Sequence, residues 1–593
     1  PDHPGVPDTL ELQERARLAL HCLTETTDPQ ADYEPYYVVR LCERPPAMYH
    51  SSWHGSTLAK YIEMAPLMRI ISGSEQNRQV ERRWTEVALK MQGPDGLIYT
   101  PARGRPWADQ ELGGTFENFG VKIEGDQYIT AFGNGRMLSA MSLLAQRDGG
   151  PLWRDAARRL VDGLVELAVD AGDVAYFWPT VLFSKKGGPP DGRVRTPYIN
   201  SESSRVPHGL VHAYRLLGYE PALILAGKVI NYLRRYFYGP DGAFHSTPGN
   251  PHKAHFHAHS HGLLAMMEYA LTADDQELME FVVRSFQWAI DAGANWQERG
   301  WEEIVKTRGA SLVGYFSTFL NSDQAHSSEI CEVSDMIALA LKLSEAGIGD
   351  YWDDADRWLR NMLVEGQLTS TDWVDDLPET GFPPDQNPYR TTERVAERNL
   401  GAFAGWPAAN DWAIRDAYGT MQCCTVNGAR ALYWIWDSAL RHQGGKLRVN
   451  LLLNRASPWA DVDSHIPYRG QVDVRVKQPV GLEIRIPEWV APRETRCQVN
   501  GEERSLAWDG RYARVGRVKP DETATLSFPI SERTDVVNIE KRAYTLVRKG
   551  NEVVSIDPPG RYYPFYQREH YRSNTTRWRT IERFVCRERI PIL

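Results

Sequence analysis

Three of the chain's seven cysteines lie in two short clusters that are far apart in the sequence. Glu329 and Cys331 occur in Ser-Ser-Glu-Ile-Cys-Glu, and Cys423 and Cys424 are adjacent in Met-Gln-Cys-Cys-Thr-Val-Asn-Gly-Ala-Arg. Three thiolates and one carboxylate form a sulfur-rich set of four ligands that Zn²⁺ accepts. A thiolate held on zinc can also act as a nucleophile. The two clusters together are therefore a candidate zinc site.

The spacing of these residues leaves two other interpretations open. Buried thiols commonly pack as small apolar side chains, and adjacent cysteines can form a strained vicinal disulfide. Glu-x-Cys with Cys-Cys is also less specific than a pair of Cys-x-x-Cys knuckles.

The local sequence indicates where the two clusters must lie. Residues two apart on a helix do not face each other, so Glu329 and Cys331 can converge on one metal only in an extended turn or at the first turn of a helix. The clear helical run after them begins near Met336, and Cys423 and Cys424 likewise precede a helical run. We expect both clusters at helix starts, on one rim of the fold.

The chain from residue 8 to residue 443 has the apolar spacing of three and four that is typical of helices, with breaks rich in Gly, Pro and Asp. The pattern predicts about twelve helices. They are expected near residues 9–25, 56–73, 76–92, 127–146, 151–170, 203–217, 220–237, 259–273, 275–293, 328–346, 350–364 and 424–440.

Most of these helices form close pairs, and two pairs end in the same phrase, Gly-Pro-Asp-Gly, at 93–96 and 239–242. About six such hairpins predict an (α/α)6 barrel as the catalytic domain, over residues 8–443. An open α-solenoid is the alternative, but the long, aromatic loops 93–126, 171–202 and 365–420 disfavour it.

After about residue 444 the hydrophobic period changes to two, which is typical of half-buried strands. The alternating segments are 447–451, 472–476, 482–487 and 524–528. This pattern predicts a β-sandwich domain over 444–535. The last segment, 536–593, is expected to complete a second, reduced sandwich or to pack back on the barrel. The fold class is thus mainly α with β.

The order of these motifs resembles the zinc-dependent glycoside hydrolases of family 127, the β-L-arabinofuranosidase family. The similar features are Glu-x-Cys at a helix start, then after a long gap Cys-Cys-x-x-Asn-Gly-x-Arg, and in the β-domain Arg-Ile-Pro-Glu-Trp at 485–489 followed by Val-Asn-Gly at 499–501. The resemblance implies Zn²⁺ held by Glu329, Cys331, Cys423 and Cys424, with Cys423 as the nucleophile that attacks the anomeric carbon.

A retaining, exo-acting glycosidase is the activity that this resemblance implies. Displacement by a thiolate and then by water gives net retention at the anomeric carbon. The expected substrate is an oligosaccharide or polysaccharide with a terminal furanose-type or unusual sugar, β-L-arabinofuranose being the default.

The chain departs from the family where the acid/base should lie. The family has a glutamate in a Gly-Glu-Gly-Phe type of segment, and residues 309–317 contain no glutamate. Asp323 is the nearest upstream carboxylate in this region, with Glu302 and Glu303 as further candidates. The family's His-Glu-x-Tyr phrase is also changed, to Asp-Gln-Tyr at 126–128. We therefore expect a changed substrate as well.

Alternating histidines at 255, 257, 259 and 261 form the other unusual cluster. They could hold a second metal, although one or two bonding to a substrate hydroxyl is the commoner outcome. We favour His259 and His261 as substrate-binding or proton-transfer residues because they open a helix that the barrel places on its inside.

Composition excludes some functions. A net charge of −9, a pI near 6.0 and the lack of a basic run argue against nucleic-acid binding. No apolar run reaches the length of a membrane helix. The 19 Trp and 27 Tyr suit sugar binding as well as core packing. The first residues resemble neither a signal peptide nor a natural start, so we expect a trimmed chain, periplasmic, secreted or cytoplasmic, and a homodimer is possible.

Two further functions stay open from sequence. An (α/α)6 polysaccharide lyase or sugar epimerase would use the histidines and a tyrosine as proton carriers, with structural cysteines. A catalytically silent glycan-binding protein would keep zinc for stability. A lyase product absorbs in the near ultraviolet, a hydrolase releases reducing sugar, and a binding protein does neither.

Overall fold

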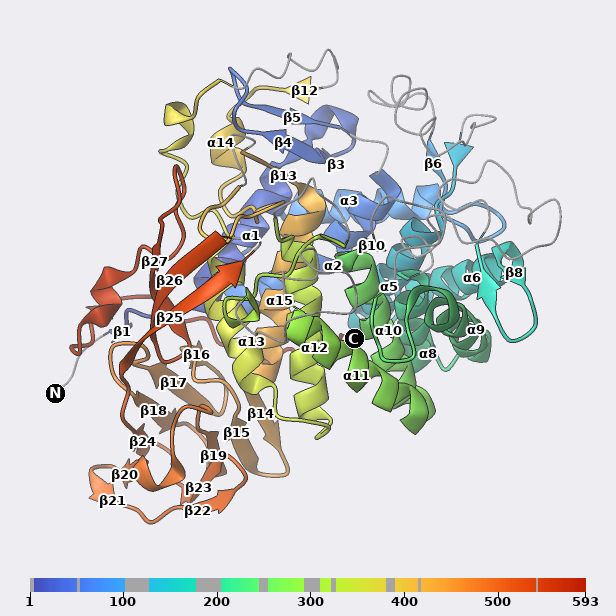
Figure 1. Cartoon of the computed structure of the whole chain (residues 1–593). Helices are drawn as coiled ribbons and strands as arrows, with labels where there is room; N and C mark the ends of the chain where they lie inside the picture. Colours follow the sequence, from blue (N-terminus) through green and yellow to red (C-terminus); the bar gives the residue numbers. More distant parts are fainter. Residues whose placement is uncertain are drawn as a thin grey trace.

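The computed structural model describes most of the chain. The described residues are 5–50, 54–101, 127–177, 204–244, 254–292, 310–320, 327–379, 390–413, 418–539 and 542–592. Helices dominate up to residue 439, and the larger sheets follow them in the sequence (Figure 1). The chain therefore has the mixed architecture, helical first and sheet-rich afterwards, that its hydrophobic periods predict.

Six helices contact one another in a closed cycle. They are α2 (His54–Ser72), α5 (Ala131–Asp148), α8 (Val206–Leu217), α10 (Phe256–Ala273), α12 (Ile330–Glu345) and α15 (Gln422–Ala439). Each packs on the next in this order, and α15 packs back on α2. Their described residues are mostly buried on every side, which a helix shows only when other elements surround it. These are the inner helices.

Six other helices each pack on an inner helix from outside. They are α1 (Leu12–Glu25), α3 (Arg78–Met91), α6 (Pro151–Leu167), α9 (Glu220–Phe237), α11 (Gln276–Ala292) and α13 (Trp352–Trp358), the last continued by a π-helical turn, Leu359–Leu363. Their sequences are one-sided: α6 buries Trp153 and Leu160 while Arg154 and Arg158 face solvent. All twelve correspond to helices predicted from the sequence, with boundaries that differ by a few residues.

The repeated Gly-Pro-Asp-Gly phrase forms the same turn twice. Gly93 N donates to Leu97 O, and Gly239 N donates to Ala243 O, both at 2.8 Å. The last glycine of each phrase has a positive φ, 83° at Gly96 and 88° at Gly242, a conformation that L side chains rarely adopt. The repeated phrase therefore forms the same turn after two outer helices, α3 and α9.

A small sheet that the sequence patterns did not indicate leads into α15. Its four strands are β12 (Arg390–Thr391), β5 (Ala47–Tyr49), β4 (Val38–Arg40) and β13 (Gly419–Met421), in that order. Strand β13 ends one residue before α15 begins. The short helix α14 (Val395–Arg398) lies in the same long connection. The sheet fixes where the first turn of α15 lies.

Two sheets after α15 enclose a separate hydrophobic core. One contains β14 (Leu440–Gln443), β15 (Lys446–Val449), β19 (Val480–Arg485), β23 (Tyr512–Val518) and β22 (Ala507–Asp509). The other contains β16 (Arg455–Ala456), β17 (Ala460–Ser464), β18 (Gln471–Val476), β24 (Thr523–Ser527), β20 (Arg496–Val499) and β21 (Glu502–Glu503). Their inward residues form one cluster, so the predicted alternating segments are strands of a two-layer structure.

The last segment packs on the helices. Strands β25 (Glu532–Ile539), β26 (Arg542–Lys549) and β27 (Glu552–Asp557) form a three-stranded sheet whose buried residues join the hydrophobic core of the helical part. The chain then runs along the inner helices, where Tyr433 Oη donates to Ile590 O at 2.8 Å. The described residues of this segment therefore pack on the helices. Among the described helices, none is long and apolar enough to span a bilayer.

Candidate metal centre

The first turns of α12 and α15, neighbours in the inner cycle, carry the two cysteine clusters. Glu329 is the N-cap of α12 and has an extended backbone, with φ −126° and ψ 130°. Its backbone N–H donates to the Glu332 carboxylate at 2.8 Å in a capping box, which fixes this conformation. Because Glu329 stands outside the helix and Cys331 inside its first turn, the two side chains can converge.

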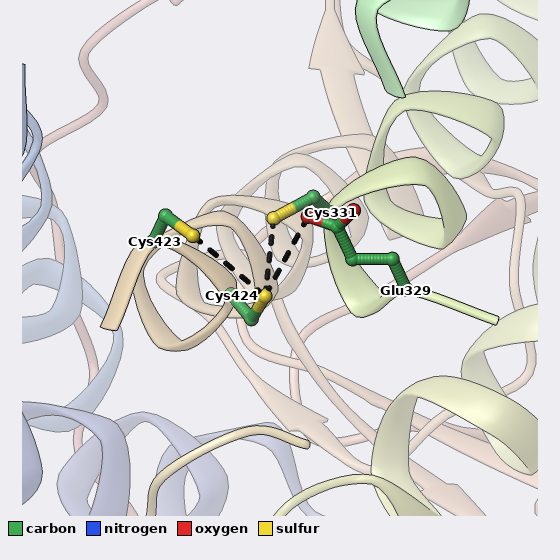
Figure 2. Close-up of side chains that lie close together, drawn as sticks. All are labelled: Glu329, Cys331, Cys423 and Cys424. Atoms are coloured by element: carbon green, nitrogen blue, oxygen red, sulfur yellow. Dashed lines mark hydrogen bonds between the residues drawn. The ribbon is translucent and has the colours of Figure 1, made fainter. Parts of the chain in front are cut away.

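The four side chains meet at one point between the two helix starts (Figure 2). The Cys331 and Cys424 sulfurs are 3.4 Å apart, and those of Cys423 and Cys424 are 3.8 Å apart. Cys424 Sγ lies 3.7 Å from Glu329 Oε1. One ligand atom from each of the four residues lies within 4.8 Å of all the others. No other such group of metal-ligating side chains occurs in the part of the chain that the structure describes.

The spacing of these atoms fits Zn²⁺. Tetrahedral zinc with Zn–S bonds of about 2.3 Å holds neighbouring sulfurs about 3.8 Å apart. Cys423 and Cys424 are free thiols, and their separation is far beyond a disulfide bond of about 2.05 Å. A donor set of three sulfurs and one carboxylate oxygen also binds zinc in preference to hard cations such as Mg²⁺ or Ca²⁺. The residues present therefore fit zinc.

The Cys423 thiol differs from its two neighbours. Hydrogen bonds from Cys331 and Cys424 hold the pKa of Cys423 well below its usual range, and the nearby Lys60 charge acts in the same direction. Burial raises the pKa of Cys331. The pKa of Cys424 is raised by the hydrogen bonds that Cys424 makes with the other two thiols. Cys423 is also half-buried whereas the other two are buried. It is the thiolate best placed to meet a substrate.

Tyr37 is a neighbour of Cys423 that the sequence patterns did not indicate. Its hydroxyl donates to Cys423 Sγ at 3.4 Å, and its backbone carbonyl accepts from Gln422 N at 2.8 Å. Tyr37 precedes β4, which pairs with β13 directly before α15. The contact depends on strand pairing between distant segments, so no local signal could have revealed it.

His255 holds the other oxygen of Glu329. Its Nε2 lies 2.7 Å from Glu329 Oε2, and it immediately precedes α10. The sequence places His255 in the histidine cluster, in which His259 and His261 are the favoured residues. The signal that could have identified it is its position before a helix start, the position that Glu329 also has.

His257 and His261 lie one turn apart on α10 and both face Asp335 of α12. His257 Nδ1 is 2.7 Å from Asp335 Oδ2, and His261 Nδ1 is 3.4 Å from Asp335 Oδ1. Burial lowers the pKa of both imidazoles well below 6.5 and raises the pKa of Asp335 to about 7. Asn427 of α15 contacts His257 Nε2 at 3.4 Å. This buried group lies beside the metal centre.

His259 points the other way. Two residues along a helix rotate the side chain by about 200°, so His259 cannot share the face of His257 and His261. Its ring stacks on Phe244, with centroids 4.7 Å apart, and meets Tyr238 edge-on at 5.3 Å. These contacts favour a packing role for His259.

The carboxylates proposed from sequence as proton donors, Asp323, Glu302 and Glu303, lie outside the described residues, as does Asp126.

Three solved structures that share the overall fold of this chain are glycoside hydrolases. One is a GH127 β-L-arabinofuranosidase from Geobacillus stearothermophilus T6, with a TM-score of 0.54 and 15% identity over 91% of this chain and 80% of that one. Another GH127 β-arabinofuranosidase has a TM-score of 0.58 and 14% identity over 93% of this chain and 84% of that one. A further glycoside hydrolase has a TM-score of 0.52 and 14% identity over 89% and 84%.

No protein-family model matches the sequence, and no curated protein matches it either. Similarity at 14 to 15% identity establishes a GH127-like fold and leaves the activity to be argued from the site.

Proposed function

We propose that this protein is a retaining, exo-acting glycoside hydrolase that holds Zn²⁺ with Glu329, Cys331, Cys423 and Cys424. The observation that carries the proposal is the convergence of these four ligand atoms within 4.8 Å at the starts of two neighbouring inner helices. The fold that the chain shares with glycoside hydrolases supports it.

The helical part, residues 8–443, is proposed to be an (α/α)6 barrel that carries the site at one rim. The closed cycle of inner helices, each with an outer partner, supports this assignment and disfavours an open solenoid. The separate core of the two sheets supports a β-sandwich domain over 444–535. Residues 536–593 form a C-terminal β segment that shares the core of the helical part.

The proposed reaction begins at the Cys423 sulfur. The thiolate attacks the anomeric carbon, so a C–S bond forms while the C–O bond to the leaving group breaks and an acid protonates the leaving oxygen. A water then attacks the same carbon and gives a proton to that residue, now a base, as the C–S bond breaks and the thiolate returns. Two inversions give net retention.

Bound zinc would keep the cysteine ligands deprotonated at neutral pH and make the Cys423 sulfur a better leaving group in the second step. Tyr37 orients this sulfur through its hydroxyl contact, and His255 orients the Glu329 carboxylate. Asp323 is the proposed acid/base, and the pair His259 and His261 is the other candidate that the sequence offers for this role.

The proposed substrate is an oligosaccharide or polysaccharide that ends in a furanose-type or otherwise unusual sugar, β-L-arabinofuranose being the default. The sequence already departs from the family at the acid/base segment and at 126–128, and these changes are the reason to test other sugars.

Covalent labelling tests the proposal. A cyclophellitol-type or haloacetamide sugar probe should label Cys423, located by peptide mass spectrometry, and an aryl glycoside screen with metal-loaded protein should release reducing sugar without near-ultraviolet absorbance. Labelling of a carboxylate while Cys423→Ser stays active would refute the nucleophile. A product with a new double bond would favour a lyase.

A further inference from the structure

Two buried cations lie deeper in the inner cycle than the metal centre. Lys60 is on α2 and Arg136 on α5, and they are only 5% and 4% exposed. Each is about six residues into its helix, as Asp335 is on α12, whereas Cys331 is in the first turn. Four residues of helix correspond to about 6 Å, so this layer lies about one turn beyond the metal ligands.

The electrostatic neighbours of these cations place them at the centre of the cycle. Burial is the largest cause that lowers the pKa of Lys60, to about 8, and the Arg136 charge adds to it, while the Cys423 and Cys331 thiolates oppose it. Burial likewise lowers the pKa of Arg136 to about 9. Arg136 also senses Asp335 and Cys331, which belong to α12 on the opposite side of the cycle.

Neither cation forms an ion pair with a carboxylate in the described part of the chain. Arg136 Nε and Nη2 are buried without a hydrogen-bond partner there, and no hydrogen bond or ion pair joins Lys60 to another described residue. A buried charge without a partner destabilises the folded state, because it has left water without gaining an opposite charge. A site with two such cations, Lys60 and Arg136, is suited to bind an anionic ligand.

The carboxylates nearby already have other partners. Glu63 forms a buried ion pair with Arg430, Asp335 accepts from Ser260 at 2.8 Å and contacts His257, and Glu329 contacts His255. Arg430 shows how this chain normally accommodates a buried guanidinium. Arg136 departs from that pattern, and its difference from Arg430 can be measured.

We propose that Lys60 and Arg136 bind a carboxylate of the substrate, so that the sugar released at Cys423 is acidic. A guanidinium offers a planar fork for a carboxylate, and an ammonium adds a point charge beside it. In an exo-acting enzyme the terminal sugar enters deepest, which is where this layer lies. The inference rests on the proposed function and names its substrate class: a uronic acid or another carboxylated sugar.

Ligand binding to the metal-loaded protein tests the inference. The probes are a panel of uronates and other carboxylated monosaccharides, each paired with its neutral parent sugar, measured by calorimetry. At least one acid should bind at least tenfold more tightly than its parent, because hydrogen bonds to charged groups are stronger than neutral ones. Arg136→Met should remove that tenfold preference. Equal binding of every acid and its parent would overturn the inference.

Stability provides a second readout without ligand. Arg136→Met should raise the Tm, because it replaces an unpaired buried charge with an apolar side chain of similar length. The matched variant Arg430→Met should lower the Tm, because it leaves Glu63 buried without its partner. If Arg136→Met lowers the Tm and also lowers the zinc content, Arg136 is a counter-charge for the metal ligands and the inference fails.

Failure of the inference and failure of the proposed function have different signatures. Binding of an acidic sugar that Arg136→Met abolishes, in a protein that hydrolyses no glycoside, would support the inference and reject the hydrolase. Hydrolysis of neutral furanosides that is unchanged in Arg136→Met, with no preference for acids, would support the hydrolase and overturn the inference.

Discussion

His255 and Glu329 are joined across two inner helices, with His255 Nε2 2.7 Å from Glu329 Oε2. The other carboxylate oxygen, Oε1, faces Cys424 Sγ at 3.7 Å. The imidazole therefore fixes which oxygen of Glu329 is directed at the three sulfurs. Hydrogen-bond partners of this kind orient metal ligands, and losing one typically weakens metal binding by about 10- to 100-fold.

Loss of this contact should weaken metal binding. We predict that His255→Ala lowers zinc affinity by about 10- to 100-fold, because the Glu329 carboxylate is no longer held toward the cysteines. Competition with a chromophoric chelator measures the affinity. His259→Ala is the matched control, since His259 packs on Phe244. An unchanged affinity in His255→Ala would show that the capping box alone orients Glu329.

The proposed metal ligands can be tested by zinc content. We predict about one zinc per chain in protein purified without chelators, and its loss in Cys331→Ser and Cys424→Ser, because a serine hydroxyl is a poor ligand for zinc. Elemental analysis measures it. Cys497→Ser, which changes a buried thiol in the core of the two sheets after α15, is the control that should keep the metal. Wild-type protein without stoichiometric zinc would leave these residues as packed thiols.

The nucleophile should be separable from the fold. We predict that Cys423→Ser removes glycosidase turnover while the Tm changes little, because Cys423 is half-buried and one oxygen replaces one sulfur in a large core. A hydroxyl is also a much weaker nucleophile than a thiolate. Initial rates on an aryl glycoside and a thermal melt of the same sample measure the two effects. Retained turnover would place the attacking atom elsewhere.

The helices could be predicted because each depends on the apolar spacing within one segment. The neighbours of the site come from segments that are distant in the sequence, and no local pattern indicates them. Apolar spacing predicted α12 and α15, and the residue types at their starts pointed to the four side chains that the structure brings together. Tyr37 reaches Cys423 only because β4 pairs with β13, some 380 residues later. Lys60 and Arg136 resemble ordinary charged helix residues in sequence, and only the folded structure shows that both are buried.

Stability should depend on pH through Glu11, which is remote from the metal ligands in sequence. Glu11 caps α1 and is 6% exposed, and burial raises its pKa from 4.5 to about 7 although Arg583 lies 3.9 Å away. A raised carboxyl pKa means that the folded state binds the proton more tightly than the unfolded state. The resulting stability is present below pH 4.5 and is lost as pH rises through 7.

Glu11→Gln should remove this dependence, because the amide cannot ionise and its oxygen can still accept the hydrogen bond from Gln13 N. We predict that the Tm of the variant, relative to that of the wild type, rises between pH 5 and pH 8. The corresponding relative gain in the free energy of unfolding is roughly 1 to 3 kcal/mol. Thermal melts at the two pH values measure it. A difference that stays constant or falls would show that Arg583 keeps Glu11 ionised.

The identity of the acid can be decided by the leaving group. An aryl glycoside with an acidic phenol needs little protonation, whereas a sugar leaving group needs it fully. We predict that Asp323→Asn keeps much of the wild-type rate on the aryl substrate and loses on the order of a hundredfold on the natural glycoside.

The histidines provide the contrast. His261 is bonded to Asp335 with a pKa well below 6.5 because of burial, so it is neutral at neutral pH, and His259 packs between aromatic rings. His261→Ala and His259→Ala should therefore change the hydrolysis rates of the aryl substrate and of the natural glycoside by the same factor. The opposite result would assign the proton to the histidine. In that case His261→Ala keeps the rate on the aryl substrate alone, and Asp323→Asn lowers the rates on both substrates equally. If all three variants behave like wild type on a natural substrate, Glu302 and Glu303 become the residues to change.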